Sequence, residues 1–433
     1  MELIKYLDAE GLDWELTQTI TRGWEFYFIK HELDQHRAKE INDVTVKVLR
    51  LSEDGSTLGT AAATIPLPSD PSEMRKEEME KTAKDLAYRA SLVKNRPYTL
   101  LAGKGDHRKQ EEPVARPDIA AIAKTFVEAV RSLPETDTEF VNSYEVFVED
   151  KIRIFRNSAG IDVTEIFPRS FAEVVINARH GDHEIELYRS YNSSTCDAEA
   201  LKEDLTRTMQ FGRDRLLAEP TPALGSIDVV FSTADAVSIY RFFTERLLAN
   251  MIYQQYSDWS IGKDVAPEAE GDRLTITALQ ELPNSSYNTA FDAEGAPITD
   301  TVVMEDFVPK AVLGNRMFSC YMGLENSFIP SNYRVEGGTR TEAQLREGRY
   351  LEAVEFSDFQ VDEVTGDIFG EIRLGYLHDG DAVKIVTGGS ISGSMFGFIN
   401  NLQASKALRR YDNMEIPALT RLQGVTVTGI EKE

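Results

Sequence analysis

Hydrophobic and polar positions alternate, or run apolar over short stretches, in the first part of the chain. Such runs occupy residues 14–20, 24–29 and 44–49. A period of two over these lengths predicts β-strands. Gly23 separates the first two runs, so we expect a turn there.

The period then changes to that of an amphipathic helix. From Pro71 to about Lys94, small and apolar side chains recur at helical spacing, after Ser69-Asp70-Pro71 as a helix start. Residues 103–117 are polar and charged and predict a surface loop. Further patterns predict helices at 119–130 and 197–217, with strands at 144–148, 152–155, 174–178 and 184–191 between them.

The second half of the chain is rich in strand patterns. Pro220-Thr221-Pro222 reads as an interdomain linker. It is followed by a short strand at 227–231, a long helix at about 234–253 and, later, a short helix near 396–407. We therefore predict the α+β class, in which an N-terminal α/β sandwich-like domain (residues 1–219) precedes a β-rich, antiparallel and barrel-like C-terminal domain with one long helix (residues 226–433).

The charge and composition of the chain exclude several classes of function. The 433 residues carry 47 Lys and Arg against 72 Asp and Glu, a net charge of −25. Such an acidic chain argues against direct nucleic-acid binding and against an anionic membrane surface. The sequence contains no apolar run of about 20 residues and opens without a signal-peptide pattern, and its only cysteines are Cys196 and Cys320. We expect a cytoplasmic protein with reduced thiols.

Two histidine clusters offer candidate metal chemistry. His31-Glu32-Leu33-Asp34-Gln35-His36 spells HExxxH, a zinc-protease-like string, but it continues a strand pattern. Positions five apart on a strand point to opposite faces, so we favour a strand end or turn. His180-Gly181-Asp182-His183-Glu184 lies between two strand patterns and fits a hairpin turn, although its side chains could also ligate a metal.

The sequence gives little support for a phosphate-binding loop. Gly388-Gly389-Ser390-Ile391-Ser392-Gly393-Ser394 is rich in Gly and Ser and could cradle an anion with its amides. It lacks the lysine of a phosphate-binding loop, so a tight connection is favoured.

Several glycine-rich landmarks between residues 157 and 429 occur in a recognisable order. They are Asn157–Gly160, Thr289–Gly295, Gly337-Gly338, Thr365–Asp367 with Gly375-Tyr376 and Asp379-Gly380, Ser390–Ser394, and Gly424–Gly429. In this order the chain resembles the TldD/PmbA family, whose members are described as modulators of DNA gyrase and as peptidases. The resemblance marks Gly337, Gly338, Ser392 and Gly393 as candidate contacts to a substrate or partner.

The family's zinc site is altered in this chain. The TldD branch carries HExxxH on the long helix, and the matching segment here is Arg241-Phe242-Phe243-Thr244-Glu245-Arg246. Arg241 and Arg246 replace the two histidines, and Phe242 replaces the catalytic glutamate. A guanidinium has no lone pair for zinc. The stretch 409–417 also lacks the family's late cysteine ligand, so the resemblance is to the PmbA/TldE branch.

This resemblance implies a non-catalytic subunit with no metal of its own. It would form a homo- or heterodimer, pairing with a TldD-like subunit that holds the zinc, and would help to hold unfolded peptides, for example along a strand edge. Two alternatives stay open. One is a stand-alone metallopeptidase with an atypical site at His180–Glu184, or at His31 and His36 with Glu32; the other is a homodimeric peptide-binding scaffold.

Three charged residues of the predicted long helix have two interpretations. In the structural one, Arg241, Glu245 and Arg246 form ion pairs on the helix; Arg241 and Glu245 are i,i+4 partners. In the functional one, the two arginines face a cleft and grip a substrate carboxylate or an acidic loop of the partner.

Overall fold

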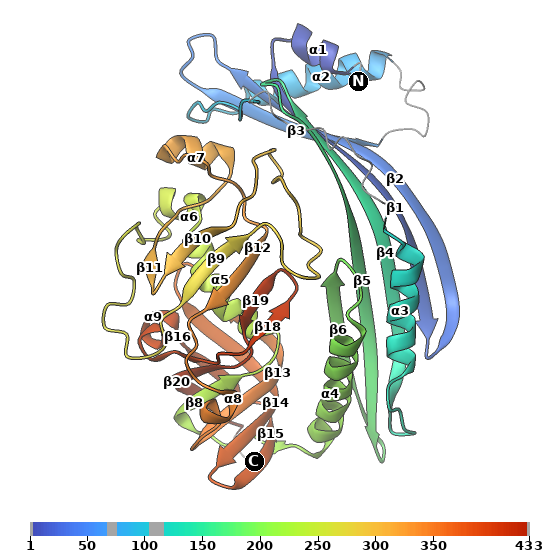
Figure 1. Ribbon diagram of the computed structural model, residues 1–433, viewed down its shortest axis with the longest axis vertical. Helices are drawn as coiled ribbons and strands as arrows, with labels where there is room; N and C mark the ends of the chain where they lie inside the picture. Colours follow the sequence, from blue (N-terminus) through green and yellow to red (C-terminus); the bar gives the residue numbers. More distant parts are fainter. Residues whose placement is uncertain (1–2, 67–75, 104–116, 431–433) are drawn as a thin grey trace.

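The computed structural model describes residues 3–66, 76–103 and 117–430. The chain forms two units that lie side by side, a long curved sheet with its helices and a more compact β-rich unit (Figure 1). The structure is 22% helical and 45% strand and belongs to the predicted α+β class.

The N-terminal unit is built on one antiparallel six-stranded sheet in the order β3-β2-β1-β4-β5-β6. Its four central strands are 17 to 20 residues long, which gives the sheet its curved, extended outline. The strands are β1 (Asp13–Ile29), β2 (Glu32–Leu51), β3 (Leu58–Pro66), β4 (Glu139–Asn157), β5 (Asp162–His180) and β6 (His183–Ser193).

Four helices cover the apolar side of this sheet. Helices α1 (Leu3–Ala9) and α2 (Lys76–Ser91) bury one cluster against β1 and β2. Helices α3 (Ile119–Arg131) and α4 (Ala198–Leu217) bury a second cluster against β4 and β5. Helix α4 also faces the C-terminal unit (Figure 1).

Two sequence predictions for this unit are wrong. Gly23 does not form a turn; it lies inside β1, opposite Glu149 of β4. A Cβ atom there would lie 2.6 Å from the carbonyl oxygen of Val148, so the glycine permits a close backbone approach. The predicted strands 144–148 and 152–155 are parts of the single strand β4. The predicted helix start at 69–71 lies outside the described residues, as does most of the predicted loop 103–117.

The C-terminal unit contains a closed five-stranded barrel and a second sheet. Strands β13, β8, β20, β16 and β14 follow one another in the barrel, and pairing of β13 with β14 closes it. They span β8 (Gly225–Phe231), β13 (Tyr350–Val361), β14 (Asp367–Asp379), β16 (Ser390–Ser394) and β20 (Thr420–Thr428). Thus β20, the last strand in the sequence, is hydrogen-bonded between β8 and β16.

The second sheet of this unit has the order β11-β10-β9-β12-β19-β18. Its strands are β9 (Thr275–Leu279), β10 (Thr301–Glu305), β11 (Val308–Pro309), β12 (Asn332–Glu336), β18 (Leu408–Tyr411) and β19 (Met414–Pro417). One large apolar cluster joins this sheet to the barrel and to helix α5 (Ala236–Arg246).

The predicted long helix at 234–253 is broken in two. Helix α5 ends at Arg246, and α6 (Ala249–Tyr253) begins after Leu247 and Leu248. Leu248 forms a β-bridge with Leu313, and the Ala249 amide donates to the Leu313 carbonyl at 2.8 Å. This tertiary hydrogen bond takes the place of the helical one that the Ala249 amide would otherwise make.

The remaining short elements complete the unit. The predicted helix 396–407 is shorter than expected: α9 (Met395–Phe398) and a 3-10 turn (Ile399–Asn401) precede strand β17 (Gln403–Ala404). The other helices are α7 (Arg316–Met322) and α8 (Glu342–Leu345).

The predicted linker 220–222 is partly built into a sheet. Strand β7 (Glu219–Pro220) pairs with β15 (Ala382–Thr387), and the Thr221 amide donates to the Thr387 carbonyl at 2.9 Å. Thr221 is fully buried. Every strand of the N-terminal sheet ends by Ser193, and every strand of the other two sheets begins at Glu219 or later. In the part of the chain that is described, no helix has the length and apolarity to span a bilayer.

Candidate functional site

Helix α5 presents its residues to two different environments. Phe242 is fully buried and its ring packs edge-on against Phe243, Trp259 and Phe396. Arg246 is also buried, at 2% exposure. Phe242, the position predicted from the sequence to match the catalytic glutamate of the TldD branch, is therefore part of the hydrophobic core.

Arg246 is held inside the protein by backbone carbonyls and aromatic rings. Its guanidinium donates to the Glu363 carbonyl at 2.9 Å and to the exposed Asp258 carboxylate at 2.9 Å. The same group lies 4.9 Å from the ring centre of Phe396 and 5.0 Å from that of Trp259. Such contacts suit a cation that is removed from water. Arg246 is thus fixed in the core, away from the cavity described next.

Arg241 and Glu245 lie on the other side of α5, where they line a cavity of about 530 Å³. The remaining walls come from residues within 244–250, 314–318, 329–333 and 412–414, together with Tyr287. No ion pair within 4.0 Å joins Arg241 to Glu245 among the described residues. This volume lies in the range typical of small-molecule sites.

The cavity contains two carboxyl groups in unusual surroundings. Burial raises the pKa of Glu245, as does the nearby Glu363, whereas Arg241 opposes the shift. Burial likewise raises the pKa of Asp412, in the turn between β18 and β19, while Arg241 and other arginines oppose this. Asp412 has a left-handed backbone (φ 52°), and its buried Oδ1 has no hydrogen-bond partner among the described atoms. These acids are thus held in a partly desolvated site.

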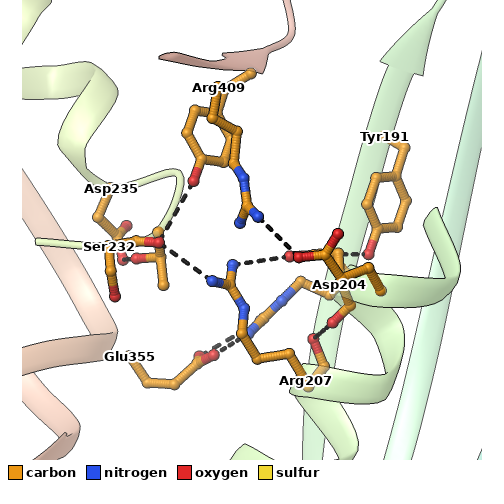
Figure 2. Close-up of polar contacts among 12 residues, drawn as sticks. Tyr191, Asp204, Arg207, Ser232, Asp235, Glu355 and Arg409 are labelled. Atoms are coloured by element: carbon orange, nitrogen blue, oxygen red, sulfur yellow. Dashed lines mark hydrogen bonds and ion pairs between the residues drawn. The ribbon is translucent and has the colours of Figure 1, made fainter. Parts of the chain in front are cut away.

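A polar network fixes the two elements that carry these acids (Figure 2). The backbone carbonyl of Ser232, just before α5, accepts from Arg207 of α4 at 3.3 Å and from Tyr411 of β18 at 3.4 Å. Asp204 of α4 pairs with Arg207 at 3.1 Å and accepts from Tyr191 at 2.7 Å. Helix α4 of the N-terminal unit therefore helps to place the cavity walls of the C-terminal unit.

Further ion pairs of the network also connect the two units. Arg409 of β18 pairs with Glu203 of α4 at 2.9 Å. Arg189 of β6 pairs with Glu355 of β13, and both side chains are largely buried.

The other predicted contact residues lie outside the cavity. Gly337 and Gly338 pack against backbone, since a Cβ atom would lie 2.0 Å from the Arg273 carbonyl oxygen and 2.1 Å from that of Ser405, respectively. Ser392 and Gly393 belong to β16, in the barrel wall, and the ring of Phe398 covers Gly393. Their proposed contact with a substrate or partner stays a prediction.

The histidine clusters lie in hairpin turns and on the adjoining strand ends, as favoured from the sequence. His31 lies in the turn directly before β2 and bonds to Glu135 at 2.9 Å, whereas His36 lies on β2 opposite Phe26. His180 and His183 flank the β5–β6 turn, where Gly181 has φ 59°. His107 lies outside the described residues. Within residues 3–66, 76–103 and 117–430, no group of three or more His, Cys, Asp or Glu could hold a metal.

Asp412 is the site residue that sequence analysis did not find. The stretch 409–417 attracted attention only because it lacks a cysteine. The polar pair Asp412-Asn413 between two short strands is a turn signal, but such signals are common. Only the tertiary structure brings this turn to the cavity beside α5.

The fold and site define a two-unit α+β protein whose β-barrel unit carries a polar cavity beside a helix. Residues 224–429 match the family model described as the PmbA/TldA metallopeptidase C-terminal domain. This match assigns the C-terminal unit, residues 224–429, to the TldD/PmbA family. A comparison with curated proteins found no significant match.

Solved structures share the fold over the full length of the chain. TldE from Thermococcus kodakarensis is 17% identical, with a TM-score of 0.77 and coverage of 99% of each chain. A proposed modulator of a DNA gyrase from Thermotoga maritima is 18% identical, with a TM-score of 0.75, over 99% of this chain and 98% of that one. A similar protein from Bacteroides thetaiotaomicron is 14% identical, with a TM-score of 0.74 and the same coverage.

Proposed function

We propose that this chain is a non-catalytic, PmbA/TldE-like subunit of a cytoplasmic TldD/TldE-type metalloprotease. Its partner would be a TldD-like subunit that holds the zinc, and the assembly would degrade or process unfolded peptides. The observation that carries the proposal is the arrangement of helix α5. There Phe242 is buried in the core, and Arg246 is enclosed by aromatic rings and carbonyls.

The chemistry of these side chains supports the absence of a resident metal. Zinc needs lone pairs from imidazole, thiolate or carboxylate groups. Arginine offers none, because its guanidinium stays protonated. Phenylalanine has no ligating atom either, so Phe242 and Arg246 cannot hold zinc, and Phe242 is packed in the core around α5.

In this proposal the cavity beside α5 contributes to substrate binding. Strand β18 forms the edge of its sheet and leads directly into the Asp412 turn at the cavity wall. An extended peptide that paired with a nearby strand edge could place a residue in the cavity.

The first experiment measures zinc and peptidase activity together. The purified chain, a TldD-like subunit from the same source and their mixture are each assayed for zinc by elemental mass spectrometry and for cleavage of an unfolded peptide. We expect well below one zinc per chain, no cleavage by this chain alone, and co-elution with the TldD-like subunit in size-exclusion chromatography.

Other outcomes would overturn the proposal. Stoichiometric zinc with cleavage by the isolated chain would favour a stand-alone metallopeptidase; His180→Ala/His183→Ala and His31→Ala/His36→Ala variants would then locate the site. A homodimer that binds peptide, ignores the TldD-like subunit and cleaves nothing in any mixture would favour a scaffold.

A further inference from the structure

The face of the N-terminal sheet that turns away from helices α3 and α4 carries a row of aromatic rings. Val146 of β4 and Val174 of β5 pack under those helices. Because side chains alternate along a strand, the residues beside them point to the other face. There the ring of Phe147 lies 5.5 Å from that of Tyr27 on β1 and 5.8 Å from that of Phe171 on β5. The three rings are half-buried and pack into no core cluster of the described residues.

Carboxylates alternate with these rings on the same face. Glu145 of β4 lies directly opposite Glu173 of β5, and two residues further along Phe147 lies opposite Phe171. Like charges directly opposite each other destabilise a sheet. Burial raises the pKa of Glu145, and the nearby Glu173 adds to this rise, as expected for carboxylates that repel each other. These four residues form a surface that we name the aromatic–acidic patch.

The basic residues near the patch are paired with other carboxylates. Arg37 of β2 donates to Glu25 of β1, and Lys39 and Lys151 pair with Glu149 at 2.7 and 3.2 Å. Within the part of the chain that the structure describes, no ion pair within 4.0 Å involves either carboxylate of the patch. The patch therefore carries two negative charges that the described side chains do not neutralise.

Arg37 shows how this face of the sheet holds a cation. Its guanidinium donates to the Glu25 carboxylate at 2.7 Å and lies 5.2 Å from the centre of the Tyr27 ring. A guanidinium suits such a place because it is planar, permanently charged and weakly hydrated. The aromatic–acidic patch offers the same combination of ring and carboxylate next to it, and no described arginine or lysine stacks on its rings.

We propose that the aromatic–acidic patch belongs to the surface that pairs with the TldD-like subunit, and that it receives an arginine side chain of that subunit. The guanidinium stacks on Phe147 and Phe171 and donates to Glu145 and Glu173. The occupant is a protein rather than a free peptide, because one such contact on an open sheet is weak and becomes effective only within a larger interface. A basic contact surface also complements this chain, whose net charge is −25.

The inference deepens the proposed function, on which it rests for the identity of the partner. The two fail in different ways. A pairing that does not depend on the patch leaves the proposed function intact and contradicts only the inference, whereas the absence of any pairing contradicts both.

The test is isothermal titration calorimetry of the full chain with the TldD-like subunit from the same source, at about 50 and about 300 mM potassium chloride. At the lower salt concentration Glu145→Gln/Glu173→Gln should bind about tenfold or more weakly than the wild type, because charge-assisted contacts are lost. This difference should shrink at the higher concentration. Phe147→Leu keeps an apolar side chain but removes the ring, and should weaken binding about threefold or more.

Thermal stability distinguishes recognition from a structural role. Glu145→Gln/Glu173→Gln removes a repulsion between opposite carboxylates, so its melting temperature should equal or exceed that of the wild type. Carboxylates that served to stabilise the sheet would give the opposite result. The control Glu77→Gln/Glu78→Gln makes the same change of net charge at exposed positions of α2 and should leave the affinity unchanged.

Two results would overturn the inference alone. One is equal affinity of the wild type and Glu145→Gln/Glu173→Gln for the TldD-like subunit. The other is an equal loss of affinity in Glu77→Gln/Glu78→Gln, since that would reflect the net charge of the chain and not the patch. If the folded wild type, checked by circular dichroism, does not bind the TldD-like subunit at all, the inference and the proposed function are both wrong.

Discussion

At the scale of single residues, α5 separates a core face from a cavity face within one turn of helix. Phe242 and Arg246 are buried, whereas Arg241 and Glu245 line the cavity. If a zinc-protease site had been lost only by substitution, reversal of the substitutions, including that of the catalytic glutamate, would restore it. Here the position of Phe242 argues against that, since its ring belongs to the aromatic cluster around Trp259.

The variant Phe242→Glu should therefore unfold the protein rather than restore a zinc protease. It places a carboxylate in a fully buried site without a partner, and we expect a loss of about 4 kcal/mol or more in unfolding free energy. Urea denaturation followed by circular dichroism measures this loss. The control Arg241→His, at an exposed position of the same helix, should change stability by less than about 0.5 kcal/mol. Near-native stability of Phe242→Glu would show that α5 can turn this position toward the cavity.

The raised pKa of Glu245 predicts a pH-dependent stability. Its ordinary value is 4.5, and burial raises the folded-state pKa above this. Between the two values the folded state binds more protons than the unfolded state, so this group's contribution to stability falls as pH rises through that window. We expect Glu245→Gln to have a higher melting temperature than the wild type at pH 7, and the difference to shrink as pH falls toward 4.5. If Glu245→Gln raised the melting temperature equally at pH 7 and at pH 4.5, the raised pKa of Glu245 would not be the cause.

At the scale of secondary-structure elements, α4 connects the two units. One face of it packs on the N-terminal sheet through Leu201, Leu205 and Met209. Its other side chains reach Ser232 and Arg409 of the C-terminal unit. The buried pair Arg189–Glu355 crosses the same boundary.

A double-mutant cycle on Arg189 and Glu355 should reveal strong coupling. Removal of either partner leaves the other charge largely buried and unpaired, at a cost of about 3 kcal/mol for Arg189→Met or Glu355→Met. The double variant should be more stable than the sum of the two losses predicts, by about 1–3 kcal/mol. Chemical denaturation of the four proteins provides the measurement, and strictly additive losses would contradict it.

Locally encoded elements were predictable from the sequence. Helix α3 begins after Asp118 and α4 after Asp197, and both caps accept a hydrogen bond from the amide three residues later. The turn at Gly181 was predictable because it too is encoded by neighbouring residues, with a glycine in the left-handed conformation. In contrast, the break after α5 depends on the contact of Leu248 with Leu313, and the need for glycine at position 23 depends on the carbonyl of Val148. In each case the two residues are more than 60 positions apart in the sequence. Asp412 was missed because the cavity exists only when distant segments meet.

At the scale of the whole molecule, the units are joined by a second buried contact near the start of β5. Glu165 pairs with Arg153 on the neighbouring strand and accepts from the backbone amides of Ala290 and Phe291, at 2.5 and 3.2 Å. Arg153 donates in turn to the Phe291 carbonyl. A loop of the C-terminal unit is thus hydrogen-bonded to a buried ion pair of the N-terminal sheet.

These contacts predict that the two units unfold together. Differential scanning calorimetry of the wild type should show one thermal unfolding transition. In Glu165→Ala the unfolding should begin at a lower temperature and occur in two transitions, one for each unit. The control Glu173→Ala, on the same strand without a described contact to the C-terminal unit, should retain a single transition. Two transitions already present in the wild type would show that the interface is too weak to couple the units.

The central place of β20 in the barrel has a consequence for synthesis on the ribosome. Because β8 and β16 meet only through β20, the barrel cannot close until the last part of the described chain has emerged. The N-terminal sheet uses residues up to 193 only and can fold much earlier. During the interval, β8 and β16 each present an unpaired strand edge, which is a known route to aggregation. The nascent chain therefore needs protection at those edges, and slow translation of its last segment would prolong that need.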